Sequence, residues 1–174
     1  MSDQQSDSSR AAWVHDIVQE YEGRLLRYAS HVLGDVDRAR DVVQDTFVKL
    51  CREPRQKIEG HVGEWLFTVC RNRAFDVQRK EKRMNSMTEQ QSRSQASREK
   101  GQAEAAEQRD SADQVMRVLG QLSANQQEVV RLKFQSQLSY KEISRITDLS
   151  VSNVGYLIHT AVQKLRQELS VDCS

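Results

Sequence analysis

The sequence predicts an all-α protein built from two small helical domains that are joined by a flexible linker. The chain of 174 residues holds only 7 Gly and 1 Pro, too few to supply the turns of a many-stranded sheet. Its apolar residues recur at the steps of three and four that are typical of amphipathic helices. Residues 84–113 contain no Leu, Ile, Val, Phe, Tyr or Trp. Such a stretch cannot bury enough apolar surface to fold, so it marks the boundary between the domains.

After a disordered N-terminus at residues 1–12, the first domain is predicted to cover residues 13–83. Its first helix carries one apolar stripe, formed by Val14, Ile17, Tyr21, Leu25, Tyr28 and Val32. Gly34 ends this helix and Asp35 caps the next one. The second helix has its own apolar stripe, formed by Ala39, Val42, Val43, Phe47 and Leu50.

The third helix of this domain is predicted to begin between residues 59 and 62, after a loop formed by Pro54 and the charged residues 55–57. Its first turns carry the apolar residues Val62, Trp65, Leu66 and Val69. Residues 71–83 continue the helix with six basic and two acidic residues. This segment therefore has a charge of +4, and because the whole chain sums to +1, the remainder sums to −3.

Residues 84–114 are predicted to be the linker, and residues 115–170 the second domain. Two capping-box patterns predict helix starts in this domain, Ser123 with Gln126 and Ser139 with Glu142. A short support helix follows the first box, a second helix follows the next, and a final helix covers residues 151–169. Two helices joined by a tight turn after a support helix are typical of a helix-turn-helix domain.

Composition and motifs exclude several classes of protein. No stretch is long and apolar enough to span a membrane, and residues 1–10 lack the layout of a signal peptide, so we expect a cytoplasmic protein. The three Cys residues are widely spaced, which indicates reduced thiols and no zinc site. No P-loop, nucleophile elbow or HExxH motif occurs. We therefore expect no enzymatic activity, no metal and no cofactor.

The basic helix at residues 71–83 has two interpretations. Arg71, Arg79, Lys82 and Arg83 fall on one broad helix face, with Trp65, Phe67 and Phe75 nearby in sequence. A positive stripe attracts phosphates and aromatic rings stack on unpaired bases, whereas a solvated charged face beside an aromatic core would give the same pattern. The outward residues of the second helix, such as Asp41, Asp45 and Lys49, are likewise either a solvated face or a docking surface.

The helix-turn-helix pattern indicates DNA binding, although an ordinary helical hairpin would have the same periodicity. In this motif the second helix enters the major groove while the first crosses the DNA backbone. Lys141 and Arg145 lie on the first helix, where phosphates would be contacted. The outer side of the second helix carries the candidate base-reading residues Ser152, Asn153, Tyr156, His159 and Thr160.

Three motifs in order resemble a known family. Residues 65–76, followed by Arg79, resemble regions 2.3–2.4 of bacterial sigma-70-type initiation factors, and residues 39–47 resemble region 2.2. Residues 138–143 through Val154, with residues 161–166, resemble region 4.2. The domain order and short length are similar to the extracytoplasmic-function (ECF) group, which keeps regions 2 and 4 only.

The resemblance implies a function for each surface. Region 2.2 would bind the β′ clamp helices of RNA polymerase core through Asp41, Gln44, Asp45 and Phe47. Regions 2.3–2.4 would open the −10 promoter element and hold its unpaired bases through Trp65, Phe67, Arg71, Asn72, Arg79, Lys82 and Arg83, with Asn72 at the family's base-contacting asparagine. Region 4 would bind the β flap and the −35 element through Lys141, Arg145 and the outer residues of the final helix. An anti-sigma factor is a further candidate partner, and the free protein is expected to be a monomer.

One departure from the family keeps two alternatives open. No Lys or Arg occurs between Val151 and Gln163, where the family's recognition helix usually carries several, so contacts to −35 phosphates should be few. The chain could instead be a decoy that binds polymerase without binding promoters. It could also be a stand-alone helix-turn-helix regulator, which would need neither the motif at residues 41–47 nor that at residues 65–76.

Overall fold

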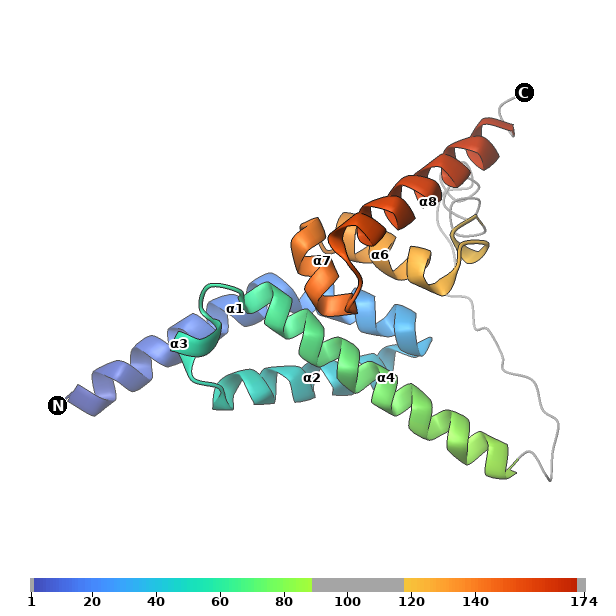
Figure 1. Ribbon diagram of the computed structural model, residues 1–174. Coiled ribbons are helices and arrows are strands. Elements are labelled where there is room, and N and C mark those ends of the chain that lie inside the picture. Colours follow the sequence, from blue (N-terminus) through green and yellow to red (C-terminus); the bar gives the residue numbers. More distant parts are fainter. Residues whose placement is uncertain (1, 89–117, 172–174) are drawn as a thin grey trace, which may run out of the picture.

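Two groups of packed helices make up the described part of the chain (Figure 1). The structure is a computed structural model that describes residues 2–88 and 118–171. These residues form helices, turns and short connections, with no strand among them. The predicted all-α fold class is therefore confirmed.

The first domain consists of α1 (Ser2–Leu33), α2 (Val36–Arg52), α3 (Arg55–Ile58) and α4 (Val62–Thr88). Its core is built from the apolar stripes of the three long helices, including Leu25, Val42, Leu50, Leu66 and Phe67. Asp35 caps α2, because its side chain accepts a hydrogen bond from the backbone N–H of Arg38 at 2.9 Å. Gly34, with φ of +69°, makes the left-handed turn that separates α1 from α2.

The second domain consists of α6 (Ala124–Phe134), α7 (Tyr140–Thr147) and α8 (Val151–Val171). Both predicted capping boxes are present in full, at Ser123 with Gln126 and at Ser139 with Glu142. Asp148 ends α7 with φ of 58°, and this tight turn leads into α8. The buried residues of these helices, among them Leu132, Ile143, Val154 and Ile158, hold the helix-turn-helix together.

Helix α1 begins earlier than the sequence predicts. Residues 2–12, expected to be disordered, belong to the helix. Near its start, the guanidinium of Arg10 donates hydrogen bonds to the backbone oxygens of Cys51 at 2.9 Å and Glu53 at 2.8 Å. These carbonyls lie at the end of α2, so the early turns of α1 are tied to the domain by a contact that helical periodicity does not reveal.

Two other segments also differ from the prediction. Residues 55–58 form the single turn α3 rather than a loop, with Pro54 directly before it and Ile58 buried at its end. Helix α4 continues to Thr88 and so includes residues 84–88, which the sequence predicts to be part of the linker. The rest of that predicted linker, residues 89–114, lies outside the described residues.

The two domains lie against each other, with α7 packed on α4 (Figure 1). A single cluster of buried apolar side chains continues from the first domain into Val129, Leu132, Leu138, Ile143 and Ile146 of the second. We call this contact the closed arrangement. The sequence predicts two domains on a tether, and the closed arrangement adds a shared core between them.

Candidate functional site

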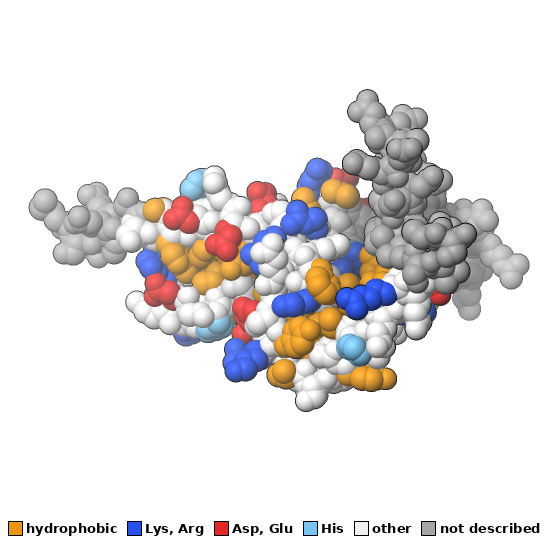
Figure 2. Space-filling view, turned by 90° about the horizontal axis from the view of Figure 1, so that it is seen from above, with side chains coloured by type: hydrophobic (Ala, Val, Ile, Leu, Met, Phe, Trp, Pro, Cys, Tyr) orange, Lys and Arg blue, Asp and Glu red, His pale blue; other side chains and the backbone are white. Residues whose placement is uncertain are grey.

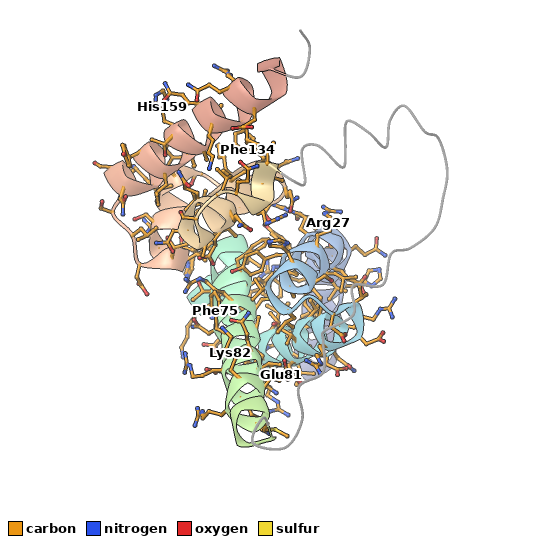
Figure 3. All side chains as sticks on the ribbon, turned by 90° about the vertical axis from the view of Figure 1, so that its right-hand side faces the viewer. Arg27, Phe75, Glu81, Lys82, Phe134 and His159 are labelled. Atoms are coloured by element: carbon orange, nitrogen blue, oxygen red, sulfur yellow. The ribbon has the colours of Figure 1, made fainter. Side chains whose placement is uncertain are left out.

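The basic face of α4 forms a shallow pocket of about 520 Å³. Its walls are Arg71, Asn72, Phe75, Asp76, Gln78, Arg79 and Lys82. Figure 3 shows Phe75 and Lys82 projecting from this helix. Asn72, Arg79, Lys82 and Arg83 are exposed, and Trp65 is half-buried against the core. Six of the seven residues predicted to contact the −10 element thus lie wholly or partly at the surface of α4.

Phe67 is the exception, and its predicted contact with DNA is wrong. Its side chain is fully buried and packs edge-on against Tyr28, with ring centroids 5.8 Å apart. Phe67 shares the inner face of α4 with Cys70 and Ala74, which are three and seven residues further on. A ring on that face cannot stack on a base, so Phe67 is part of the core.

Arg71 is held in an ion pair between the domains. Its Nε donates to Oε1 of Glu128 on α6 at 2.7 Å, and its Nη2 donates to Oε2 at 3.2 Å. The hydroxyl of Tyr28 on α1 donates to the same Oε1 at 2.7 Å. The side chains of Arg71 and Glu128 are only 19% and 13% exposed. Glu128 therefore joins three helices through charge-assisted hydrogen bonds.

Burial and charge change the acid–base behaviour of this cluster. Burial, followed by the charge of Glu128, raises the pKa of Tyr28 well above its ordinary value. Burial is the largest influence on the pKa of Arg71 and lowers it, but the hydrogen bonds and the charge of Glu128, with smaller contributions from Tyr28 and Asp148, together raise the pKa above its ordinary value. Both shifts favour the protonated, donating forms of Tyr28 and Arg71.

A second ion pair between the domains involves Arg145, predicted to contact −35 phosphates. Its Nη1 lies 2.8 Å from Oε2 of Glu64 on α4. The Arg145 side chain is 63% exposed, so this pair contributes little to stability. Arg24 on α1 also donates to the backbone oxygen of Ser136. These contacts, with the Glu128 cluster, connect the domains through side chains from both.

The outer side of α8 presents most of the predicted base-reading residues. Ser152, Asn153, Tyr156 and His159 are exposed, as is Lys141 on α7, and Tyr156 is 66% exposed. Figure 2 shows Lys and Arg side chains interspersed with hydrophobic ones over the middle of one face of the molecule. Because Ser152, Asn153, Tyr156 and His159 recur at helical spacing along α8, they form one continuous surface.

Thr160 does not belong to that free surface. Its hydroxyl accepts a hydrogen bond from the amide of Gln126 on α6 at 3.0 Å and donates to backbone oxygens of its own helix. The predicted base contact of Thr160 is therefore replaced by a contact that fixes α8 against α6. Sequence spacing misses this because position 160 lies at the margin between the inner and outer faces of α8.

A groove between α1 and α2 contains two of the predicted polymerase-binding residues. It has a volume of about 470 Å³, and its walls include Gln44 and Phe47, together with Val18, Leu26, Val43, Val48 and Cys51. Asp41 is exposed outside the groove, and Asp45 pairs with Arg73 of α4 at 2.9 Å. The two carboxylates thus lie beside the groove rather than in it.

The sequence pattern does not reveal three groups of functional interest, namely Glu64, Glu128 and the apolar walls of the α1–α2 groove other than Phe47. No local pattern marks them, because each acquires its role from a helix that is distant in sequence. Within the residues that the structure describes, no three His, Cys, Asp or Glu side chains cluster in a way that would hold a metal ion. A search of the same residues finds no helix long and apolar enough to cross a membrane.

Comparison with known families gives two matches that follow the domain order. Residues 17–84 match the family Sigma-70 region 2, and residues 112–165 match Sigma-70, region 4. Together the two matches span both helical groups.

Curated relatives and solved structures agree with these matches. The chain is 30% identical to the ECF RNA polymerase sigma factor SigL of Mycobacterium tuberculosis, with 94% of each chain covered. It is 26% identical to the ECF sigma factor SigM of Bacillus subtilis, covering 88% of this chain and 93% of that one. Its fold is similar to that of the sigma factor RpoE of Bartonella quintana, solved with the anti-sigma factor NepR, at a TM-score of 0.65 and 24% identity, covering 90% and 98%. CnrH, solved with the cytosolic domain of CnrY, gives a TM-score of 0.60 at 22% identity, covering 97% and 95%.

Proposed function

The chain belongs to the sigma-70 family of RNA polymerase sigma factors, in the ECF group, and from this premise we propose how its surfaces divide the work of initiation. As a member of that family it is a transcription initiation factor that recognises promoters. Sigma factors are non-catalytic, and we extend this to the present chain. Its contribution then consists of binding energy and position.

The α1–α2 groove is our proposed docking site for the β′ clamp helices of polymerase core. An amphipathic helix buries its apolar face in such a groove. The apolar walls, including Phe47 and Val48, would accept that face, while Gln44, Arg40 and Glu22 supply polar groups at the same groove. Asp41 and Asp45 lie beside the groove, where they would contact basic residues on the rim of the interface.

The α4 surface is our proposed site for the opened −10 element. Asn72 is exposed beside Arg79 and Lys82 in one pocket, so an amide that can read a base edge lies next to cations that can hold the backbone. Trp65, Arg71 and Arg83 extend this surface. A cationic pocket favours an unpaired strand because unstacking costs only a few kcal/mol per base.

The α7–α8 surface is our proposed site for the −35 duplex and lies in the part of the molecule that also meets the β flap. Lys141 and Arg145 would contact phosphates, and Ser152, Asn153, Tyr156 and His159 would face the major groove. The match to region 4 supports a helix-turn-helix domain at this surface, and the decoy reading is left to the transcription test below. We propose that an anti-sigma factor is a further partner, since the similar sigma factor RpoE is solved in complex with one.

Simultaneous binding of both elements requires the domains to separate. The elements are 25 base pairs apart by their positions, which is about 85 Å of duplex at 3.4 Å per pair. The domains touch in the closed arrangement, so one molecule cannot reach both sites in that form. Residues 89–117 can span up to about 100 Å when extended, which is sufficient. In this account the closed arrangement is a resting form that opens on polymerase.

The single observation that carries the proposal is the exposed Asn72 set in the basic α4 pocket, in a chain whose two domains match regions 2 and 4. The test is in vitro transcription with core polymerase on a pool of genomic promoters. We expect start sites that depend on the chain. Asn72→Ala should reduce promoter opening at least tenfold while leaving core binding unchanged, because the amide reads DNA and does not touch polymerase.

The control is Gln56→Ala, which changes an exposed amide on α3 and should transcribe as the wild type does. No start site despite binding to core would contradict the proposed function and favour the decoy. Equal loss of opening and core binding in Asn72→Ala would contradict the role assigned to that residue.

A further inference from the structure

A cleft of about 450 Å³ lies between the two domains, next to the Arg71–Glu128 pair. One wall comes from α1 and α4 and includes Tyr28, His31, Arg71, Phe75 and Lys82. The opposite wall comes from α6 and includes Asn125, Gln127, Glu128 and Arg131. Figure 3 shows Phe75 and Lys82 on the α4 side. A volume in this range is typical of small-molecule sites.

Arg131 is the unusual residue of this cleft. It is only 6% exposed, yet no carboxylate pairs with it among the residues that the structure describes. Its Nε is buried and has no hydrogen-bond acceptor. A buried guanidinium without an anion costs free energy, since the charge has lost its water and gained no partner. Arg71, in the same cleft, is instead paired with a carboxylate, because its Nε and Nη2 both donate to Glu128.

The cleft around Arg131 carries more positive than negative charge. The cleft walls carry the cations Arg71, Lys82 and Arg131 and a single carboxylate, Glu128, which already accepts hydrogen bonds from Arg71 and Tyr28. The first turn of α6, at residues 124–125, lies on the same wall. A helix N-terminus adds backbone donors and a partial positive charge. The pKa of His31 is lowered by burial and then by Arg131, which reports the same positive field.

We propose that this cleft binds a phosphate-bearing small molecule, of the size of pyrophosphate or a nucleotide, whose phosphate pairs with Arg131 and Lys82. Phosphate suits the site because it has several acceptor oxygens and more than one negative charge to distribute among a guanidinium, an ammonium and backbone N–H groups. The ligand contacts both domains, so it stabilises the closed arrangement. Binding of the phosphate-bearing ligand to the cleft does not depend on the proposed function. Only its consequence, a slower engagement of promoters by the stabilised closed arrangement, rests on that function.

The test measures thermal unfolding of the full chain with and without sodium pyrophosphate, and with ATP in a second series, against sodium chloride of equal ionic strength. The key variant is Arg131→Met, and the matched control is Arg52→Met, which makes the same change at an exposed arginine of α2. We expect a ligand at about 100 times its Kd to raise the melting temperature of wild type and control by several degrees. Arg131→Met should show no such rise. Without ligand it should unfold at or above the wild-type temperature, because the change removes an unpaired charge.

An equal rise in Arg131→Met, or no rise in the wild type with either ligand, would overturn the proposal. If Arg131→Met does not fold, Lys82→Met replaces it, since Lys82 is exposed on α4 and its loss should weaken pyrophosphate binding about tenfold. A single-stranded 12-nucleotide DNA is titrated as a separate arm. Binding of that DNA with no binding of pyrophosphate or ATP would assign the cleft to the promoter strand and also overturn the proposal.

Discussion

Glu128 connects three helices in the closed arrangement. It accepts hydrogen bonds from Tyr28 on α1 and from Arg71 on α4 while lying on α6. Because Arg71 also belongs to the proposed −10 surface, the same guanidinium is used by the closed arrangement and by DNA. Pairing with Glu128 thus makes Arg71 unavailable to a promoter until the domains part.

Replacing Glu128 by Gln should shift the protein toward an open form. The change keeps the shape of the side chain but removes its charge, and a hydrogen bond to a charged group contributes about 1.5–3 kcal/mol. The ratio of closed to open molecules should therefore fall about 10- to 100-fold. The distance between dyes on Cys51 and on a cysteine at Arg166→Cys, in a Cys173→Ser background, measures this shift. Glu168→Gln, at an exposed site on α8, should leave the distance unchanged, and an unchanged distance in Glu128→Gln would contradict the role of this pair.

The cysteines of the first domain should differ sharply in reactivity. Burial raises the pKa of the Cys70 thiol to about 12, so at pH 8 only about one molecule in ten thousand carries the reactive thiolate. Cys51 is exposed at the α1–α2 groove. In a Cys173→Ser background, maleimide should label Cys51 quickly and Cys70 only after unfolding.

Core polymerase should slow labelling of Cys51 at least tenfold and promoter DNA alone should not. Undiminished labelling in the holoenzyme would argue against docking at this groove.

At the scale of elements, local signals in the sequence predict where helices begin, whereas contacts between distant helices leave no local signal. Asp35, Ser123 and Ser139 mark helix starts because a cap acts within three residues. The sequence predicts Phe67 on the DNA surface, because an aromatic ring near a basic stretch gives the same pattern whether it faces inward or outward. The close approach of α4 to α1 also leaves no local signal in the sequence. A Cβ at Gly63 would lie 2.9 Å from the hydroxyl oxygen of Tyr21, which explains the glycine only once both helices are in place.

The low charge of α8 should give −35 binding a shallow dependence on salt. Lys141 and Arg145 are the two cations assigned to phosphates here, so the slope of log K against log salt should be about −2. Gln163→Arg extends the exposed face of α8 by one cation and should steepen the slope by about 0.9. A duplex from a promoter that the factor transcribes is the suitable probe, and Gln56→Arg, on α3, is the control. A wild-type slope as steep as about −6 would show that the duplex binds a different surface.

At the scale of the whole molecule, the closed arrangement and promoter recognition are two states of one chain. A sequence contains little information about such an interface, because its contacts join α4 with α7 and Arg71 with Glu128 across 57 positions. The apolar residues that form it, such as Leu138, also satisfy the periodicity of their own domain. The two helical groups could therefore be predicted from the sequence, while the contact between them required the structure.

The most direct test of this account is the distance between the two domains in a functioning initiation complex. Dyes on Gln56→Cys in α3 and on Arg166→Cys in α8, both exposed positions outside the proposed docking groove, in a Cys51→Ser and Cys173→Ser background, measure it in the free protein and in holoenzyme bound to a promoter. The account predicts a distance tens of ångströms longer on the promoter, as the separation of about 85 Å between the elements requires. An unchanged distance in complexes that start transcription would contradict it.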